Sequence, residues 1–194
     1  TATAMRMDLM TQIDDSRIEG VHLALRLAQP SDAAYIYGLR IDPTYNRYLS
    51  EVTGTVQDQE DWLRRYKERE ASGSEYYYVI ERLADAQPCG LVRLYDIERD
   101  HCTWGSWILD QNKPPKAALE SAVLSYVAAF ERLKLSKALI DVRLNNDRSL
   151  RFQHRLGAVE IRRDNRDIFF EYSRTRFLAR MRFAFSQENT KAET

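Results

Sequence analysis

The sequence predicts an α/β (α+β) fold in which a mixed, mostly antiparallel central sheet of six to seven strands carries helices on both faces. Three observations predict it. Residues 75–109 contain three strand-like segments joined by short links, which is typical of an antiparallel meander. Residues 116–133 then change to helical spacing, and a further strand follows at residues 138–144. Strand, helix and strand in this order form a βαβ crossover, whose two strands run parallel in one sheet.

The N-terminal part contains the first strand and the first helix. Residues 1–20 show no clear period and are interpreted as an N-terminal extension. Residues 21–27 alternate as a strand does. The Pro-Ser-Asp segment at residues 30–32 is typical of a helix start, and this helix should end near Ile41, because Asp42-Pro43 breaks it.

A tyrosine-bearing loop, residues 44–54, precedes a second and highly charged helix. Thr55 is the expected N-cap, since a threonine side chain accepts a hydrogen bond from the first helical amides, and the helix should continue to about Ala71. Apolar residues are scarce in it, so we expect this helix to cover the sheet from outside. Its inward-facing residues would be Val56, Trp62, Leu63 and Tyr66.

Three strands are predicted next, at residues 75–83, 89–98 and 102–109. Their short links make an antiparallel meander that leads into the crossover. The third strand holds Trp104 and Trp107, which either point to opposite faces or flank a β-bulge. We expect both tryptophans to pack in the core, with a role in a pocket wall as the second interpretation.

The crossover follows the turn Asp-Gln-Asn-Lys-Pro-Pro, which ends the third strand. Its helix, residues 116–133, presents one apolar stripe to the sheet: Leu119, Ala122, Val123, Tyr126, Phe130 and Leu133. The strand at residues 138–144 comes next. Asn145-Asn146-Asp147 is an N-cap cluster that opens a short helix, and Gly157 ends this helix in the left-handed conformation that glycine adopts easily.

Two more strands, at residues 159–163 and 167–172, complete the sheet. The sheet domain therefore spans residues 21–173, and residues 174–194 form a C-terminal helical tail. Arginines stand among aromatic residues in this tail, and because the chain is neutral overall, packing or a homodimer contact is favoured over nucleic-acid binding. One apolar side of the tail would carry Phe177, Leu178, Met181 and Phe185.

Composition narrows the class of protein. The chain has 194 residues with 29 Lys plus Arg against 29 Asp plus Glu, so no net field attracts nucleic acid or an anionic membrane. Three histidines and two cysteines are too scattered for a metal site. Cys89 and Cys102 lie in or beside strands, so we expect buried free thiols rather than a disulfide. No apolar run is long enough to span a membrane and no signal peptide is recognisable, so we expect a cytoplasmic protein.

The order of these elements, together with two short motifs, resembles the acyl-CoA-binding half of the GNAT N-acetyltransferase superfamily. Residues 146–149 (Asn-Asp-Arg-Ser) and 154–158 (His-Arg-Leu-Gly-Ala) look like the Asn-x-x-Ser and Lys-Leu-Gly-Phe signature of its ribosomal-protein-acetyltransferase-like branch. Residues 25–37 look like the opening strand and first helix of that branch, and residues 58–66 like its second helix. The resemblance covers about residues 21–172 and implies a single GNAT-like domain whose parallel crossover forms an acyl-CoA cleft.

The resemblance implies that acetyl-CoA is the co-substrate and that its pantetheine lies between two splayed strands, residues 102–109 and 138–144. Backbone groups in the first of these strands would bind pantetheine and present one amide to the oxyanion: those of Trp107, Ile108 and Leu109. Asn146 would hydrogen-bond pantetheine or substrate, and Ser149 would lie near the sulfur. The alternative role of Asn146 and Ser149 is plain capping of the helix that follows.

The loop that would bind the pyrophosphate departs from the family. Its usual pattern, Gln/Arg-x-x-Gly-x-Gly/Ala, brings backbone amides to two phosphates. Here residues 113–118 read Lys-Pro-Pro-Lys-Ala-Ala, and the two prolines remove two amide donors, although the lysines could supply charge instead. The resemblance then assigns cofactor binding to Lys113, Lys116, Ala117 and Ala118. The alternative is a loop that no longer binds a nucleotide.

The acid and the base are the least defined groups in the sequence. Many members of the superfamily place a tyrosine acid four residues before the glycine of the motif. Gln153 occupies that place here, so the acid is Ser149, water or absent. Asp96 is the first choice for the base, ahead of Glu98 and His101 near the same loop. The alternative role of Asp96 is an exposed carboxylate at the end of a strand.

Together these observations predict an acyl-CoA-dependent N-acyltransferase, more narrowly an N-acetyltransferase that moves acetyl directly from acetyl-CoA to a primary amine. The acceptor would be a small molecule, such as a nucleotide-linked amino sugar, or a protein N-terminus. No Ser/Cys–His–Asp constellation indicates a covalent intermediate. The alternative hypothesis is a catalytically degenerate GNAT-fold binding or scaffold protein with weakened CoA binding, which Pro114, Pro115 and Gln153 favour.

Overall fold

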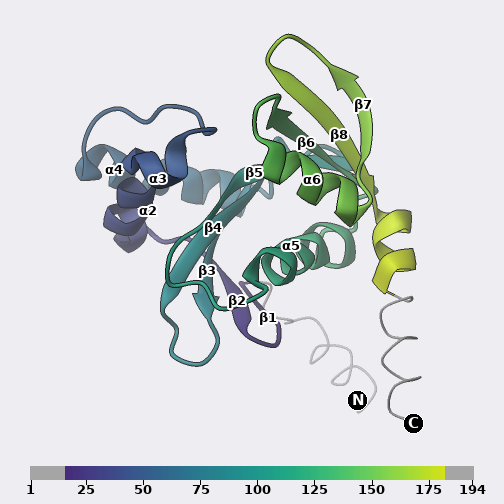
Figure 1. Ribbon diagram of the computed structural model, residues 1–194. Coiled ribbons are helices and arrows are strands. Elements are labelled where there is room, and N and C mark those ends of the chain that lie inside the picture. The colour runs from purple at the N-terminus through teal and green to yellow at the C-terminus, as the bar shows by residue number, and fades with distance from the viewer. Residues whose placement is uncertain (1–15, 182–194) are drawn as a thin grey trace, which may run out of the picture.

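The sheet is built around one parallel pair of strands. The computed structural model describes residues 16–181, whose strands form one eight-stranded sheet in the order β1-β2-β3-β4-β5-β6-β8-β7 (Figure 1). All neighbours are antiparallel except β5 and β6, so the predicted crossover is confirmed. The strands are β1 (Arg17–Glu19), β2 (Leu23–Leu27), β3 (Tyr76–Arg82), β4 (Pro88–Tyr95), β5 (His101–Leu109), β6 (Lys137–Arg143), β7 (Val159–Arg163) and β8 (Asp167–Ser173).

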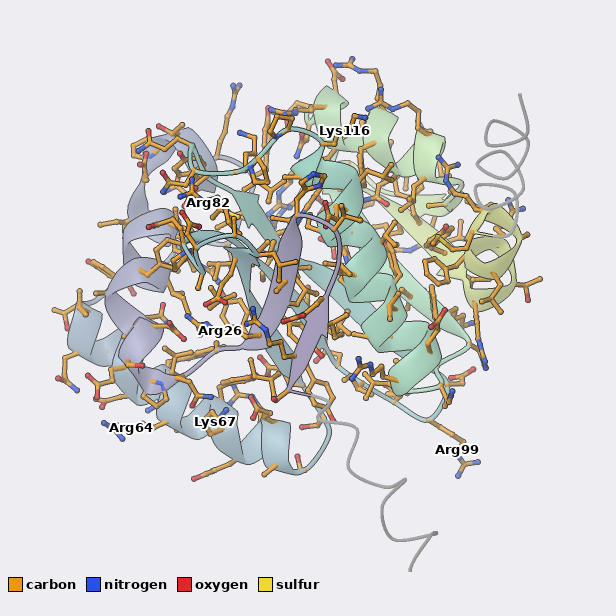
Figure 2. All side chains as sticks on the ribbon, turned by 90° about the horizontal axis from the view of Figure 1, so that it is seen from below. Arg26, Arg64, Lys67, Arg82, Arg99 and Lys116 are labelled. Atoms are coloured by element: carbon orange, nitrogen blue, oxygen red, sulfur yellow. The ribbon has the colours of Figure 1, made fainter. Side chains whose placement is uncertain are left out.

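The eighth strand is β1, which lies in the segment predicted as an extension and raises the sheet above the six or seven strands expected. Three residues are too few to show a period, so tertiary contacts place this strand. Ile18 is buried, and Arg17 forms an ion pair with Glu81 at 3.0 Å. Glu81 also accepts a hydrogen bond from Arg26 Nε (Figure 2). Nη1 of the same guanidinium donates to Asp32 Oδ2 at 2.8 Å.

Helices cover both faces of the sheet, as predicted (Figure 1). One face carries η1 (Pro30–Asp32), α2 (Ala33–Ile41), α3 (Pro43–Asn46) and α4 (Val56–Ala71); the other carries α5 (Ala117–Val127), its π-helical continuation η2 (Ala128–Arg132), and α6 (Asp147–Leu156). Each layer buries its own apolar cluster: α2 and α4 pack on Tyr77, Val79 and Leu91, whereas α5 and η2 pack on the opposite side of the same strands. The short helix α3 begins at Pro43 and overlaps the start of the stretch, residues 44–54, that the sequence assigned to a loop.

The helix α4 begins after Thr55, as predicted, but one of the residues expected to face inward is exposed. Thr55 and Asp58 form a capping box, in which each side chain accepts a hydrogen bond from the other residue's backbone amide. Val56 was expected to face inward and is 41% exposed; it is the first residue of the helix, directly after the Thr55 N-cap. Gln59 is buried in its place.

The helix that follows β8 packs as the sequence predicted. Residues 174–181 are helical, Phe177 is 2% exposed, and Leu178 and Met181 pack against the same cluster. Phe185, the fourth expected apolar residue, lies outside the described residues. No helix among residues 16–181 is long and apolar enough to cross a membrane. Cys89 and Cys102 are free and buried, as predicted.

Candidate active site

The strands β5 and β6 separate after a short paired segment and leave a gap in the sheet. Only His101–Thr103 pair with Lys137–Leu139, and beyond them β5 pairs with β4 alone and β6 with β8 alone. The facing edges of both strands therefore present backbone N–H and C=O groups that no neighbouring strand pairs. A cleft of about 520 Å³ occupies the gap.

A β-bulge in β5 shapes one wall of this cleft. Arg93 pairs with Gly105 and Leu91 with Ile108, so Ser106 and Trp107 together stand opposite one residue of β4. Ser106 takes φ 49° at the bulge. The extra residue turns Trp107 to the same face as Trp104, with the two rings 5.2 Å apart. Of the two arrangements that the sequence allowed, the structure shows the bulge.

Both tryptophans are fixed by α5. The indole N–H of Trp104 donates to Ser125 Oγ at 2.7 Å, and that of Trp107 donates to Ser121 Oγ at 3.1 Å. Trp104 also stacks on Tyr126 with ring centroids 5.6 Å apart. The tryptophans therefore pack in the core and line the cleft at once, and the wall around the bulge is held rigidly by buried hydrogen bonds.

The bulge depends on a glycine in the neighbouring strand. Gly90 of β4 lies so close to β5 that a Cβ added there would overlap the carbonyl oxygen of Ile108. A glycine in a strand often marks such a close approach of two backbones. Gly90 thus lets β4 follow the bent part of β5, where Ile108 lines the cleft.

One side of the gap opens between α5 and α6 into a second cavity of about 220 Å³. Among the residues predicted to bind the cofactor, Trp107, Leu109, Lys113, Ala118 and Ser149 line this cavity. Ile108 and Asn146 line the main cleft instead. Lys116 and Ala117 line neither of the two: Lys116 stands at the N-terminal end of α5 with φ 64° (Figure 2), and Ala117 is buried beneath it.

Two further cations surround this cavity, and sequence reasoning missed them. Arg148 and Arg155 of α6 line it together with Lys113. They lie seven positions apart, which places them on one face of a helix, and this spacing was a signal that the sequence already contained. Of the three cations that line this cavity, two therefore come from α6 and one comes from the loop of residues 113–118.

Asn146 both caps α6 and faces the cleft. Its Oδ1 accepts a hydrogen bond from the Ser149 amide at 3.2 Å, which is the capping role weighed from the sequence. The cap uses only one acceptor, so the amide N–H donors of Asn146 stay available. Asn146 and Ser149 both line the cleft, so capping does not exclude a contact with a ligand.

The opposite side of the gap is spanned by α3. Tyr45 Oη accepts a hydrogen bond from the Gln111 amide at 3.2 Å, just after β5. Tyr48 Oη donates to the Asn145 carbonyl at 3.1 Å, just after β6. These two tyrosines join the ends of the separated strands, and Thr44 and Leu49 line the cleft beside them.

Asp141 of β6 lies on this same side and was not anticipated. Ile140 and Val142 point into the core beside α5, so alternation turns Asp141 and Arg143 toward α3. Asp141 lines the cleft with an exposed side chain, and the cleft walls that displace solvent near its carboxylate, together with the nearby carboxylate of Asp167, raise the pKa of Asp141 above its ordinary value.

Asp96 lies at the wrong end of the strand pair for the role predicted. It follows β4, whose last residue, Tyr95, pairs with Thr103 at the closed end, and it does not line the cleft. His101 is likewise at the closed end, with Nδ1 2.9 Å from Asp100. The sequence did not indicate which end of β5 and β6 separates, and that decides which carboxylate faces the gap.

Gln153 lies where the two sides of the gap meet. It is 1% exposed and lines the cleft, yet its side-chain oxygen has no hydrogen-bond partner in the described part of the protein. A buried polar atom without a partner costs about 1–3 kcal/mol, so such atoms are commonly found where a ligand or water completes the set.

The comparisons with known proteins agree with this geometry. A family model described as an acetyltransferase (GNAT) domain matches residues 22–159. Apo FdhC, described as a nucleotide-linked sugar GNAT, is 36% identical with a TM-score of 0.80, over 87% of this chain and 96% of that chain. No curated protein sequence matches the chain.

More distant solved structures share the fold. The ribosomal-protein-S5-alanine acetyltransferase of Vibrio fischeri is 16% identical with a TM-score of 0.70, over 81% of this chain and 96% of that chain. A spermidine N-acetyltransferase, SpeG, of Vibrio cholerae is 19% identical with a TM-score of 0.69, over 82% and 98%. The family model covers more than half of the chain and lies over the split strands, the bulge and α6, so the chain belongs to the GNAT acetyltransferase family.

Proposed function

We propose that the protein is an acetyl-CoA-dependent N-acetyltransferase that moves acetyl directly to the primary amine of a nucleotide-linked amino sugar. The observation that carries this proposal is a gap through the sheet that opens on both faces. One opening is lined by cations with no carboxylate among the described residues, and the other by tyrosines and arginines together with the carboxylates of Asp141 and Asp147. A polyanionic donor and an amine that enter from opposite sides would meet in the gap, and their proximity supplies much of the rate.

The cation-lined opening fits the phosphates of acetyl-CoA. Lys113, Arg148 and Arg155 surround it, and arginine binds phosphate with two parallel hydrogen bonds. Phe152 and Leu109 supply apolar surface between these cations and the gap. Pantetheine would lie along the open edge of β5, where its amides can pair with the backbone of residues 107–109 as an added strand does.

The chain's own groups account for each proton and charge in the transfer. Asp141, directly or through one water, takes the proton of the amine, which then attacks the thioester carbonyl. The backbone amide at the bulge and the side-chain donors of Asn146 and Gln153, which line the cleft, would hydrogen-bond the oxyanion or the departing thiolate. The C–S bond breaks and the C–N bond remains, and the thiolate takes a proton from solvent, either directly or through Ser149, which gives up its hydroxyl proton and regains one from solvent.

No cysteine of this chain competes as a nucleophile. Burial raises the pKa of the Cys89 and Cys102 thiols to about 12 in each case, so both stay protonated at neutral pH. This supports direct transfer between the two substrates without an acetylated enzyme.

A nucleotide-linked amino sugar is the acceptor that the comparisons favour. The chain is 36% identical to a nucleotide-linked sugar GNAT over 87% of its length, whereas its likeness to the protein and spermidine acetyltransferases is at the level of fold. A protein N-terminus is the competing acceptor, and an acceptor screen that contains both classes separates them.

The second candidate function is a GNAT-fold binding or scaffold protein that no longer transfers acetyl. Pro114 and Pro115 favour it, because they remove amide donors next to α5. The experiment is calorimetric titration of the purified protein with acetyl-CoA and with desulfo-CoA. We expect both acetyl-CoA and desulfo-CoA to bind with micromolar affinity. If neither binds at millimolar concentration, the protein is a scaffold and not an acetyltransferase.

Restoring glycines in the same loop sharpens this test. Compared with the wild type, a Pro114→Gly, Lys116→Gly variant has two glycines before α5, and the loss of Pro114 adds one backbone N–H donor there. An enzyme with a weakened loop should gain CoA affinity, whereas a scaffold should show no change.

A further inference from the structure

Arginines from three separate segments gather in a hollow beside the acceptor opening. The hollow, of about 520 Å³, is lined by Arg47 after α3, Arg143 at the end of β6 and Arg166 between β7 and β8, with Tyr48, Leu144, Asn145 and Asn165. Tyr48, Arg143 and Asn145 also line the main cleft, so the two spaces adjoin. Figure 1 shows the β7–β8 turn at the same end of the sheet as the C-terminal end of β6.

The hollow holds more positive charge than its carboxylate neutralises. Asp167 accepts from Arg143 Nη1 with both oxygens at 2.9 Å, and Arg166 Nε lies 3.6 Å from the same carboxylate. Arg47 lies over the Tyr48 ring at 5.2 Å and has no carboxylate partner within residues 16–181. One aspartate thus serves two arginines, and the third is left without an ion pair.

Other arginines of the same hairpin are paired, so the excess charge is local. Arg163 Nε lies 2.6 Å from Glu160, and Arg162 Nη1 lies 3.7 Å from Asp164. Asp164 also accepts from the amides of Arg166 and Asp167 and holds the β7–β8 turn in shape. The arginine hollow is therefore a positioned group of charges rather than a general property of the surface.

We propose that this hollow binds the diphosphate of a nucleotide-linked acceptor and so sets the substrate class, an inference that rests on the proposed function. Guanidinium groups match phosphate oxygens in planar pairs, and two side-chain amides add donors. The amine would extend past Tyr48 into the gap while the diphosphate stays among the arginines. Polyamines would be repelled by the same charges, so the hollow selects against cationic acceptors.

The hollow is distinct from the opening proposed for acetyl-CoA. Lys113, Arg148 and Arg155 lie between α5 and α6, whereas Arg47 and Arg166 lie on the side of α3. A nucleoside diphosphate should therefore bind when the cofactor side is already occupied. This simultaneous occupancy is the property that an experiment can measure.

The probe is UDP, titrated calorimetrically into the full chain with and without saturating desulfo-CoA. We expect UDP to bind in both cases, more weakly as salt rises, and inorganic pyrophosphate to compete with it. In an Arg47→Gln, Arg166→Gln variant the affinity for UDP should fall about tenfold or more, because two charge-assisted contacts are lost. The control Arg163→Gln, an exposed arginine of the same hairpin, should stay within about twofold.

The outcomes separate this inference from the proposed function. If UDP binds the double variant as well as the wild type, or if desulfo-CoA displaces it, the arginine hollow is not the diphosphate site. If desulfo-CoA binds and UDP does not at millimolar concentration, the inference fails while the acetyltransferase proposal stands. If UDP binds as described and acetyl-CoA does not bind at all, the subsite stands and the proposed transfer fails.

Discussion

The two openings of the gap between β5 and β6 are assembled in different ways. The cofactor side comes from residues 107–155, a continuous stretch that runs from the end of β5 through α5 and β6 into α6. The acceptor side is built from α3, the far face of β6 and the turn between β7 and β8. The first and last of these segments are more than a hundred residues apart in the sequence. A site built from one stretch is visible in local patterns, whereas a site built from distant stretches appears only when the chain has folded.

The two openings also differ in charge. No carboxylate lines the cofactor side among the described residues, which suits a ligand with several phosphates. The acceptor side places Asp141 and Asp167 among its arginines. A carboxylate is needed where an amine must lose a proton, and it would only repel a polyanion. A substitution can therefore weaken ligand binding or activity at both openings, or at one of them and not at the other.

The largest effect is expected from Gly90→Ala, which damages the wall that both openings share. The new Cβ would overlap the Ile108 carbonyl, so the strand must move or the bulge must be lost. We expect destabilisation by about 1–3 kcal/mol in urea unfolding, with loss of binding at both openings. The control is Gly38→Ala in α2, where an added Cβ meets nothing within 4 Å and should stabilise by about 0.4–1 kcal/mol. Equal effects of the two would show that Gly90 is not needed at the bulge.

Asp141→Asn should remove the general base on the acceptor side and leave the cofactor side unchanged. A base works when deprotonated, so wild-type kcat/KM should fall as pH drops through the raised pKa of Asp141, and the variant should lack this limb with activity reduced by about 100-fold or more. The matched control is Asp96→Asn, at the closed end of the strands. If that variant loses activity and Asp141→Asn does not, the base was correctly chosen from the sequence.

The same variant carries a stability prediction with a definite sign. The folded protein binds the Asp141 proton more tightly than the unfolded chain does, because its pKa is raised on folding. Deprotonation therefore costs stability as pH rises from the ordinary aspartate pKa through the raised value, and the cost is absent below the ordinary pKa. Asp141→Asn should be more stable than the wild type at neutral pH and equal to it in acid, as urea unfolding at two pH values will measure.

The strands and helices around the cofactor side could be predicted because their signals are local. The apolar stripe of α5, the Asn146 cap and the left-handed Gly157 each have a local pattern, although Leu119, the first residue expected in that stripe, is 47% exposed. The charges of Arg148 and Arg155 were available in the same way, since their spacing puts them on one helix face. The family motif locates phosphate binding in the loop of residues 113–118, so it gives no indication of the two arginines on α6.

The acceptor side could not be predicted by the same means. Asp141 faces the gap only because β6 leaves β5 after Leu139, and strand separation has no signature in either strand alone. The helix α3 is too short to show a period, and β1 is shorter still. Arg47 and Arg166 are 119 positions apart in the sequence. Two hydrogen bonds bring their segments to the same hollow, one from Tyr48 Oη to the Asn145 carbonyl and one from the Leu144 amide to the Arg166 carbonyl.

A smaller effect is expected from charge removal on the cofactor side. In an Arg148→Gln, Arg155→Gln variant, affinity for desulfo-CoA should fall about 10- to 100-fold, because arginine–phosphate contacts are charge-assisted. The control is Arg151→Gln on the same helix, which lines the main cleft and not the cofactor cavity. UDP affinity should be unchanged in the double variant, and a parallel loss of UDP would mean that the two openings are one site.

The smallest effect is expected at Gln153, where the two sides meet. Its unpartnered oxygen lowers stability in the absence of a ligand, so Gln153→Leu should raise stability by about 1 kcal/mol while kcat falls severalfold and KM for acetyl-CoA changes little. Urea unfolding and steady-state kinetics measure both. A variant that loses stability would show that the amide is already satisfied by the folded protein. Gain in stability with loss of kcat would instead mean that Gln153 is kept for a partner that arrives only with the substrates.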